Sequence, residues 1–134
     1  MRKRRKTPEQ DLQKAVAGYL RHALRSPTIW TAIGHGGGGA LRGAILKGMG
    51  VQPGWPDILI LHPEDHYTFV LGIELKAKGS LSPEQKAMVN SFATAGAVLV
   101  TCRSIEAVEH YLTLNGVPLY ASVSGRSASV KAAA

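Results

Sequence analysis

Three residues in the middle of the chain combine types and spacing that suit metal-assisted chemistry. Asp57 opens the apolar run 57–61, and Glu74 and Lys76 lie in the β-prone run 68–76. Because side chains alternate along a strand, Glu74 and Lys76 share one face. Burying either charge is costly unless that charge is paired. The pattern therefore predicts either a reactive centre or a structural ion pair.

A hairpin between the two runs is expected to bring the carboxylates together. If the chain turns between His62 and Tyr67, Asp57 lies opposite Gly72, and Glu74 becomes its diagonal neighbour. In this register Gly72, which has no side chain, leaves the face open. Both carboxylates would then reach one ion.

Two carboxylates with few soft ligands nearby suit a hard cation, Mg²⁺ or Mn²⁺. Such a cation polarises a phosphodiester and activates water. Lys76 would orient that water or neutralise charge developing on the phosphate. The alternative is a structural Glu74–Lys76 pair on a solvated sheet face, because Glu-x-Lys is a common tripeptide.

The first part of the chain predicts elements that would support this centre. Thr7, Pro8 and Gln10 match a helix start, with Thr7 as the cap, and Ser26–Pro27 ends that helix. The segments that follow are a β-prone stretch, a glycine-rich loop and a short helix, at 28–33, 34–39 and 40–47.

A second helix start lies after the hairpin, at Ser82-Pro83-Glu84-Gln85, and this helix closes at Gly96. The all-apolar run 97–101 predicts an interior strand, and Ser104 begins a final helix. The main elements follow the order α-β-β-α-β-α, which predicts an α/β fold with a mixed sheet flanked by helices. We expect one domain at 7–121, with a basic arm at 1–6 and a flexible Ser/Ala-rich tail at 122–134.

The charge of the chain favours a polyanionic partner. The 134 residues carry 16 Lys and Arg against 9 Asp and Glu, for a net charge of +7. Five of the basic residues lie in the arm, which leaves 11 against 9 in the remainder. A single cysteine, Cys102, is typical of a reducing cytoplasm. No apolar run reaches the length of a membrane span.

Two motifs together resemble the PD-(D/E)xK nuclease superfamily, and more closely its VRR-NUC family. They are the runs 50–57 (GVQPGWPD) and 72–76 (GIELK). The resemblance covers about Thr7 to Thr101 and implies a restriction-endonuclease-like core. It also implies a Mg²⁺- or Mn²⁺-dependent DNA endonuclease that acts on branched, junction or flap DNA. Stand-alone family members tend to be short phage or bacterial proteins that act as homodimers, so we expect the cytoplasm of a bacterium or of a phage-infected host.

The resemblance also assigns roles to residues. Asp57, Glu74, the Leu75 backbone carbonyl and Glu9 would hold the metal, Lys76 would serve the attacking water, and Gln85 would steady Lys76 or contact the phosphate. The residues predicted to bind nucleic acid are Arg2, Lys3, Arg4, Arg5, Lys6, His35, Arg42, Lys47 and Lys78.

Several of these assignments keep a structural alternative. Glu9 lies in the first turn of the predicted helix, where acidic residues are favoured for structural reasons alone. It also lies three residues before Leu12 on the apolar side of the helix, which predicts that it points inward. Gln85 is either a site residue or only a capping-box residue. His35 stands where family members often have asparagine, and the glycine run either cradles phosphates or forms a simple loop.

Other functions find less support in the sequence. The run 35–38 (HGGG) matches an esterase oxyanion loop, but the chain has no G-x-S-x-G elbow. His62 and His66 have metal-like spacing, but they lack a cysteine partner and are expected at the surface. The serious alternative is a DNA-binding module, or a nuclease-fold subunit that is inactive on its own.

Overall fold

The computed structural model describes residues 7–33 and 39–123. The basic arm, His35, most of the glycine run and the tail from 124 onward lie outside the described residues. Within them the chain forms α1 (Pro8–Ala23), β1 (Ile29–Ala32), α2 (Gly39–Gly48), β2 (Ile58–Pro63), β3 (Thr68–Leu75), α3 (Pro83–Thr94), β4 (Val98–Cys102) and α4 (Ile105–Leu114). The β-prone stretch predicted at 28–33 and the short helix predicted at 40–47 are confirmed as β1 and α2, although the predicted order of main elements left them out.

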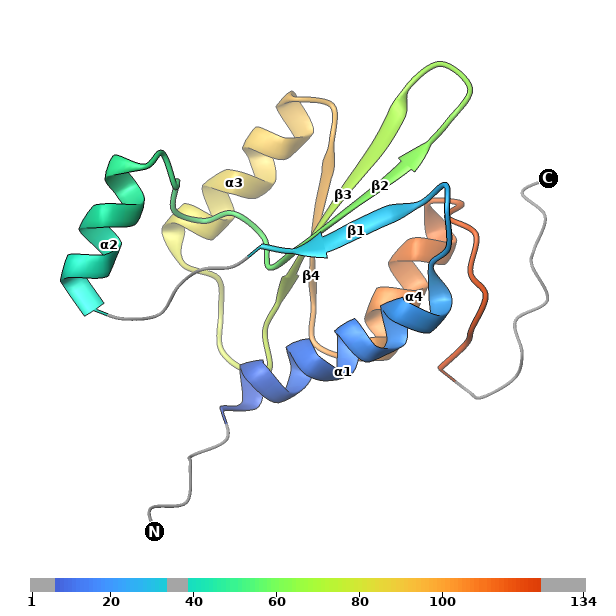
Figure 1. Ribbon diagram of the computed structural model, residues 1–134, viewed down its shortest axis with the longest axis horizontal. Helices are drawn as coiled ribbons and strands as arrows, with labels where there is room; N and C mark the ends of the chain where they lie inside the picture. Colours follow the sequence, from blue (N-terminus) through green and yellow to red (C-terminus); the bar gives the residue numbers. More distant parts are fainter. Residues whose placement is uncertain (1–6, 34–38, 124–134) are drawn as a thin grey trace, which may run out of the picture.

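The described strands form a mixed sheet in the order β1-β2-β3-β4. The first three strands are antiparallel, and β4 runs parallel to β3. The prediction that 97–101 forms an interior strand is wrong, because β4 lies at the edge of the sheet (Figure 1). The strand is apolar on both sides because α3 and α4 both contact it.

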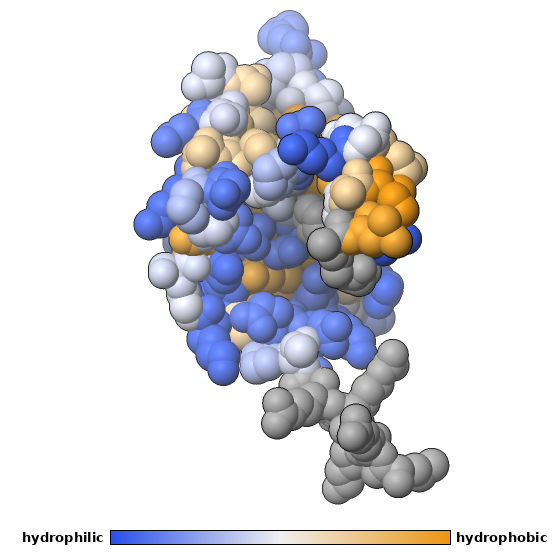
Figure 2. Space-filling model, turned by 90° about the vertical axis from the view of Figure 1, so that its left-hand side faces the viewer, coloured by the Kyte–Doolittle hydropathy of each residue, from blue (hydrophilic) through white to orange (hydrophobic). Residues whose placement is uncertain are grey.

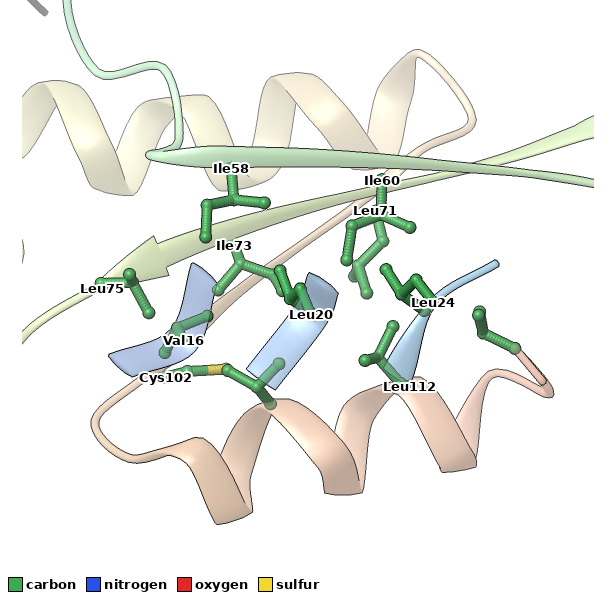
Figure 3. Close-up of a cluster of buried hydrophobic side chains, with 12 residues drawn as sticks. Val16, Leu20, Leu24, Ile58, Ile60, Leu71, Ile73, Leu75, Cys102 and Leu112 are labelled. Atoms are coloured by element: carbon green, nitrogen blue, oxygen red, sulfur yellow. The ribbon is translucent and has the colours of Figure 1, made fainter. Parts of the chain in front are cut away.

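The main core lies between α1, α4 and one face of the sheet. Val16 and Leu20 of α1 meet Ile58, Ile60 and alternate residues of β3, and all are fully or almost fully buried (Figure 3). Val16 and Leu20 are four residues apart, so they share the buried side of α1. Thr7 occupies the N-cap of α1, but its side chain makes no capping hydrogen bond, contrary to the sequence expectation.

The two faces of the sheet differ in their roles. Leu71, Ile73 and Leu75 of β3 point into the core, so Gly72 and Glu74 lie on the opposite face. The helix α3 lies on that opposite side (Figure 1). No described helix is long and apolar enough to cross a membrane.

Candidate functional site

The register of the hairpin places Asp57 beside Glu74. Leu59 pairs with Gly72 and Ile58 with Ile73, so the position before Ile58 falls next to Glu74. The predicted register, with Asp57 opposite Gly72, is therefore wrong by two residues. The faces were nevertheless predicted correctly, because the side-chain period of a strand is two residues.

The turn explains this difference in register. Pro63 of β2 pairs with Thr68 of β3, so the two strands extend closer to the tip of the hairpin than the sequence analysis predicts. The turn itself is closed by a 2.8 Å hydrogen bond from the Glu64 N–H to the Tyr67 carbonyl.

Asp57 is fixed by its backbone and by its side chain. Its N–H donates to the Ile73 carbonyl at 3.0 Å, and its carbonyl accepts from the Ile33 N–H at 2.8 Å. Its Oδ2 accepts from the Leu75 N–H at 2.7 Å. Because the N–H and C=O of one residue leave a strand on the same side, the Leu75 carbonyl also projects toward Asp57. This orientation suits the backbone-ligand role predicted for Leu75.

Glu74 is a buried acid, with 5% of its surface exposed. Its pKa is raised from 4.5 to about 8, mainly by burial and then by the charge of Asp57 and a hydrogen bond with it. The Lys76 charge opposes this rise in pKa. Glu74 therefore does not lie on a solvated face, as the structural alternative assumed.

Gln85 joins the helix α3 to this acid. It forms a complete capping box with Ser82, in which its Oε1 accepts from the Ser82 N–H at 2.9 Å. Its Nε2 donates to the Glu74 Oε1 at 2.8 Å. Gln85 therefore forms the predicted capping box and also contacts Glu74. Its contact is with Glu74, whereas the resemblance implied Lys76 or the phosphate.

The space above Gly72 is filled, which contradicts the predicted open face. A Cβ at Gly72 would lie 2.8 Å from Pro56 Cγ and 2.9 Å from Phe92 Cε2. The ring of Phe92 also meets Trp55 edge-on, with 5.3 Å between centroids. Pro56, Phe92 and Trp55 thus form a packed wall beside the acids. The sequence analysis did not predict this wall, although a glycine inside a strand often indicates that another part of the chain lies close to it.

Gly54 holds the turn before Asp57 against the first turn of α3. Its φ is +85°, and a Cβ there would lie 2.5 Å from the Glu84 carbonyl oxygen. The turn that carries Asp57 and the helix that carries Gln85 are therefore in backbone contact. This contact sets the position of both residues relative to Glu74.

The Gly54→Ala substitution is expected to lower the melting temperature and to displace Asp57 from Glu74, because the new methyl group meets rigid backbone. The matched control is Gly50→Ala, since Gly50 also has a positive φ of +95° but nothing within 4 Å of its Cβ position. Thermal unfolding measures both variants. A loss of stability of about 1–3 kcal/mol is expected from the strained backbone alone, and a larger loss is expected at Gly54. Equal losses in the two variants would contradict the importance of the contact.

Four further predicted site residues in the described part of the chain are exposed. Glu9 is exposed in the first turn of α1, so it does not point inward as predicted. Within 7–33 and 39–123, no three His, Cys, Asp or Glu residues gather in a metal-binding group. The structure thus brings Asp57 and Glu74 together without Glu9. The described candidates for nucleic-acid binding are exposed: Arg42, Lys47 and Lys78.

The histidine pair of the hairpin has a structural explanation. His62 is half-buried, and its Nδ1 lies 2.7 Å from the Thr28 hydroxyl, which ties the ends of β1 and β2 together. His66 is exposed. Both histidines were predicted to lie at the surface, and this prediction is confirmed for His66 but not for His62.

The donor set suits a hard divalent cation. Asp57 and Glu74 supply carboxylate oxygens, and the Leu75 carbonyl projects toward the same place. Burial raises the pKa of Glu74, and the charge of Asp57 adds to this rise, because two ionised acids repel each other. A cation between them would relieve that repulsion, and oxygen ligands are those that Mg²⁺ and Mn²⁺ prefer.

Comparison with solved structures places this geometry in a known fold. The chain is similar to a structure described as "VRR_NUC domain protein", with a TM-score of 0.54 and 22% sequence identity. The match covers 83% of this chain and 89% of the other. The chain has a restriction-endonuclease-like core. No family model matches the sequence, and no curated protein matches it significantly.

Proposed function

We propose that this protein is a metal-dependent endonuclease that hydrolyses phosphodiester bonds in DNA. The observation that carries the proposal is the buried Glu74 beside Asp57, near the end of the strand β3, which Lys76 follows. A binding module has no need for two acids that repel each other and would also repel a polyanion. The fold shared with a VRR_NUC domain protein supports the same function.

In this proposal Asp57, Glu74 and the Leu75 carbonyl hold Mg²⁺ or Mn²⁺. The cation supplies Lewis-acid stabilisation of the phosphate and an activated water. Lys76 orients the attacking water and offsets negative charge on the phosphate. Gln85 holds the Glu74 carboxylate in place through its 2.8 Å hydrogen bond. Asp57 is kept in position by the Leu75 N–H.

The proposed substrate is branched or structured DNA, and the proposed assembly is a homodimer. Both follow from the resemblance to the VRR-NUC family. Arg42, Lys47 and Lys78 are exposed and would contact the DNA backbone.

Cleavage of labelled four-way junction, flap and linear duplex DNA tests the proposal, with Mg²⁺, Mn²⁺ or EDTA. Lys76→Ala is expected to reduce cleavage at least about 10²-fold, as loss of a group that stabilises transition-state charge does. Lys86→Ala is the matched control, because Lys86 is exposed on α3 outside the proposed site.

Cleavage that is lost in EDTA and in Lys76→Ala, but kept in Lys86→Ala, is the expected result. Binding of these DNAs without cleavage in either metal would favour a DNA-binding module, or a subunit that is inactive alone.

A further inference from the structure

Trp55 is a large aromatic residue that the fold leaves partly open to solvent. It lies in the turn before β2, and 37% of its surface is exposed. Trp30, in contrast, packs against the main core. Leaving an indole exposed forgoes the stabilisation that its burial would bring. Tryptophan is enriched at binding surfaces, where its ring supplies a large contact area. The exposure of Trp55 therefore favours a partner outside its own chain.

The indole of Trp55 is held in place by its neighbours. The residue before it, Gly54, is in backbone contact with the first turn of α3, and the residue after it, Pro56, is buried against Gly72. The Phe92 ring meets the indole edge-on, at an interplanar angle of 70°. Such a contact covers at most one of the two faces of the indole, so at least one face stays clear of Phe92. A rigid aromatic ring binds a ligand with little loss of conformational entropy.

Trp55 also lies close to the two acids of the candidate site. It precedes Asp57 by two residues, and two residues of extended chain span at most about 7 Å. On the neighbouring strand β3, Gly72 contacts the wall that Trp55, Pro56 and Phe92 form, and Glu74 lies two residues further on the same face. A single nucleotide would therefore reach from the acids to the indole.

The arrangement matches the two chemical parts of a nucleotide. A nucleobase is flat, and its π-face stacks on aromatic side chains whichever base it is. Its phosphate is an anion, which the proposed cation and Lys76 would bind beside the indole. Figure 2 views the molecule from the side on which α2 and α3 lie in Figure 1, and hydrophobic patches there are bordered by hydrophilic surface. This mixed surface suits a ligand that is apolar at one end and charged at the other.

We propose that Trp55 stacks on an unpaired nucleobase beside the phosphate that the Asp57–Glu74 pair engages. Inside a duplex both faces of a base are covered by its neighbours, so only an unpaired or extruded base offers a free face. The site would take DNA with an unpaired base next to the scissile phosphate, as at the branch point of a flap. It would not select among the four bases. This inference rests on the proposed endonuclease function, which brings DNA to the two acids.

Fluorescence of Trp55 tests the proposal without any need for cleavage. The chain has two tryptophans, so Trp30→Phe leaves Trp55 as the single indole emitter. This protein is titrated with a single-stranded oligothymidylate, and with an oligomer of equal length whose sugars carry no bases. Both titrations are run in EDTA and in Ca²⁺, which takes oxygen ligands as Mg²⁺ does. Stacking quenches indole emission, so we expect quenching by the oligothymidylate and little by the abasic oligomer, which keeps every phosphate.

Substitution of Trp55 measures how much affinity the stacking contributes. Trp55→Ala is expected to weaken binding of the oligothymidylate between about fivefold and 150-fold, the range for loss of one stacked aromatic side chain. Trp55→Phe keeps a smaller ring and is expected to weaken it less. Binding of the abasic oligomer is expected to stay unchanged in both variants. Circular dichroism checks that each variant folds.

Tyr67→Ala is the matched control for these substitutions. Tyr67 is also an aromatic residue, and 64% of its surface is exposed. It lies at the far end of the β2–β3 hairpin, about 20 Å along the strand from Asp57. Its removal is expected to leave the affinity for both oligomers unchanged.

The outcomes separate this inference from the endonuclease function. Equal quenching by the two oligomers in both conditions would overturn the stacking proposal, whereas cleavage of flap DNA in Mg²⁺ or Mn²⁺ would still support the endonuclease. Quenching that requires bases, without cleavage in either metal, would support stacking while the endonuclease proposal fails. An equal loss of affinity for both oligomers in Trp55→Ala would also overturn the stacking proposal, because it would show that Trp55 does not act through a base.

Discussion

Replacing Glu74 by glutamine is expected to abolish metal-dependent cleavage while making the folded protein more stable at pH 8. Glutamine keeps an oxygen that can accept the hydrogen bond from Gln85, but it lacks the negative charge that a cation needs. A reduction of at least about 10³-fold in cleavage rate is expected, since electrostatic stabilisation is usually the largest catalytic effect. The cleavage assay with Mn²⁺ measures this half of the prediction.

The gain in stability follows from the raised pKa of Glu74. An unfolded chain releases this proton near pH 4.5, whereas the folded protein holds it until about pH 8. The folded state binds more protons across this window, so the free energy of unfolding falls as pH rises from 4.5 to 8. Above pH 8 the loss is complete. Glutamine does not titrate, so Glu74→Gln avoids the loss.

Melting curves of metal-free protein at pH 4.5 and pH 8 measure the predicted gain in stability. The advantage of Glu74→Gln is expected to be larger at pH 8. Glu106→Gln is the matched control, because Glu106 is an exposed acid in the first turn of α4. A lower melting temperature for Glu74→Gln at pH 8 would show that the charged form stabilises the fold, contrary to the structure.

Local patterns in the sequence were enough to place part of the site. Strand alternation predicted that Asp57 and Glu74 share a face of the hairpin, and this conclusion survives a slip of two residues. The Ser82–Gln85 signature predicted a helix start, and a complete capping box is present. Both features depend on the spacing of residues within one hairpin or one helical turn, which is where sequence patterns are informative.

Features that depend on distant parts of the chain were not predictable in the same way. The Leu75 N–H donates a hydrogen bond to the Asp57 side chain, which is possible because β2 begins only at Ile58. No residue type in the sequence indicates this hydrogen bond. The apolar run of β4 indicates that other elements cover both faces of this strand. It does not distinguish a strand at the edge of the sheet from one in its interior. Gly72 likewise signals either open space or close packing, and only the position of Phe92 decides between them.

Metal binding is expected to strengthen as pH rises toward 8, because a cation and a proton compete for Glu74. Below its pKa of about 8, Glu74 is mostly protonated and must release its proton to bind the cation. Affinity should therefore rise about tenfold for each pH unit between 6 and 8, and then level off. Calorimetric titration with Mn²⁺ at several pH values measures the affinity and the proton release together.

The same titration on Glu74→Gln provides the comparison. With glutamine at this position the competing proton is gone, so the residual affinity is expected to be weak and almost independent of pH over this range. Binding to the wild-type protein that is equally tight at pH 6 and pH 8, without proton release, would mean that Glu74 is not a ligand. The raised pKa would then reflect burial beside Asp57 alone, and the cation would have to bind elsewhere on the chain.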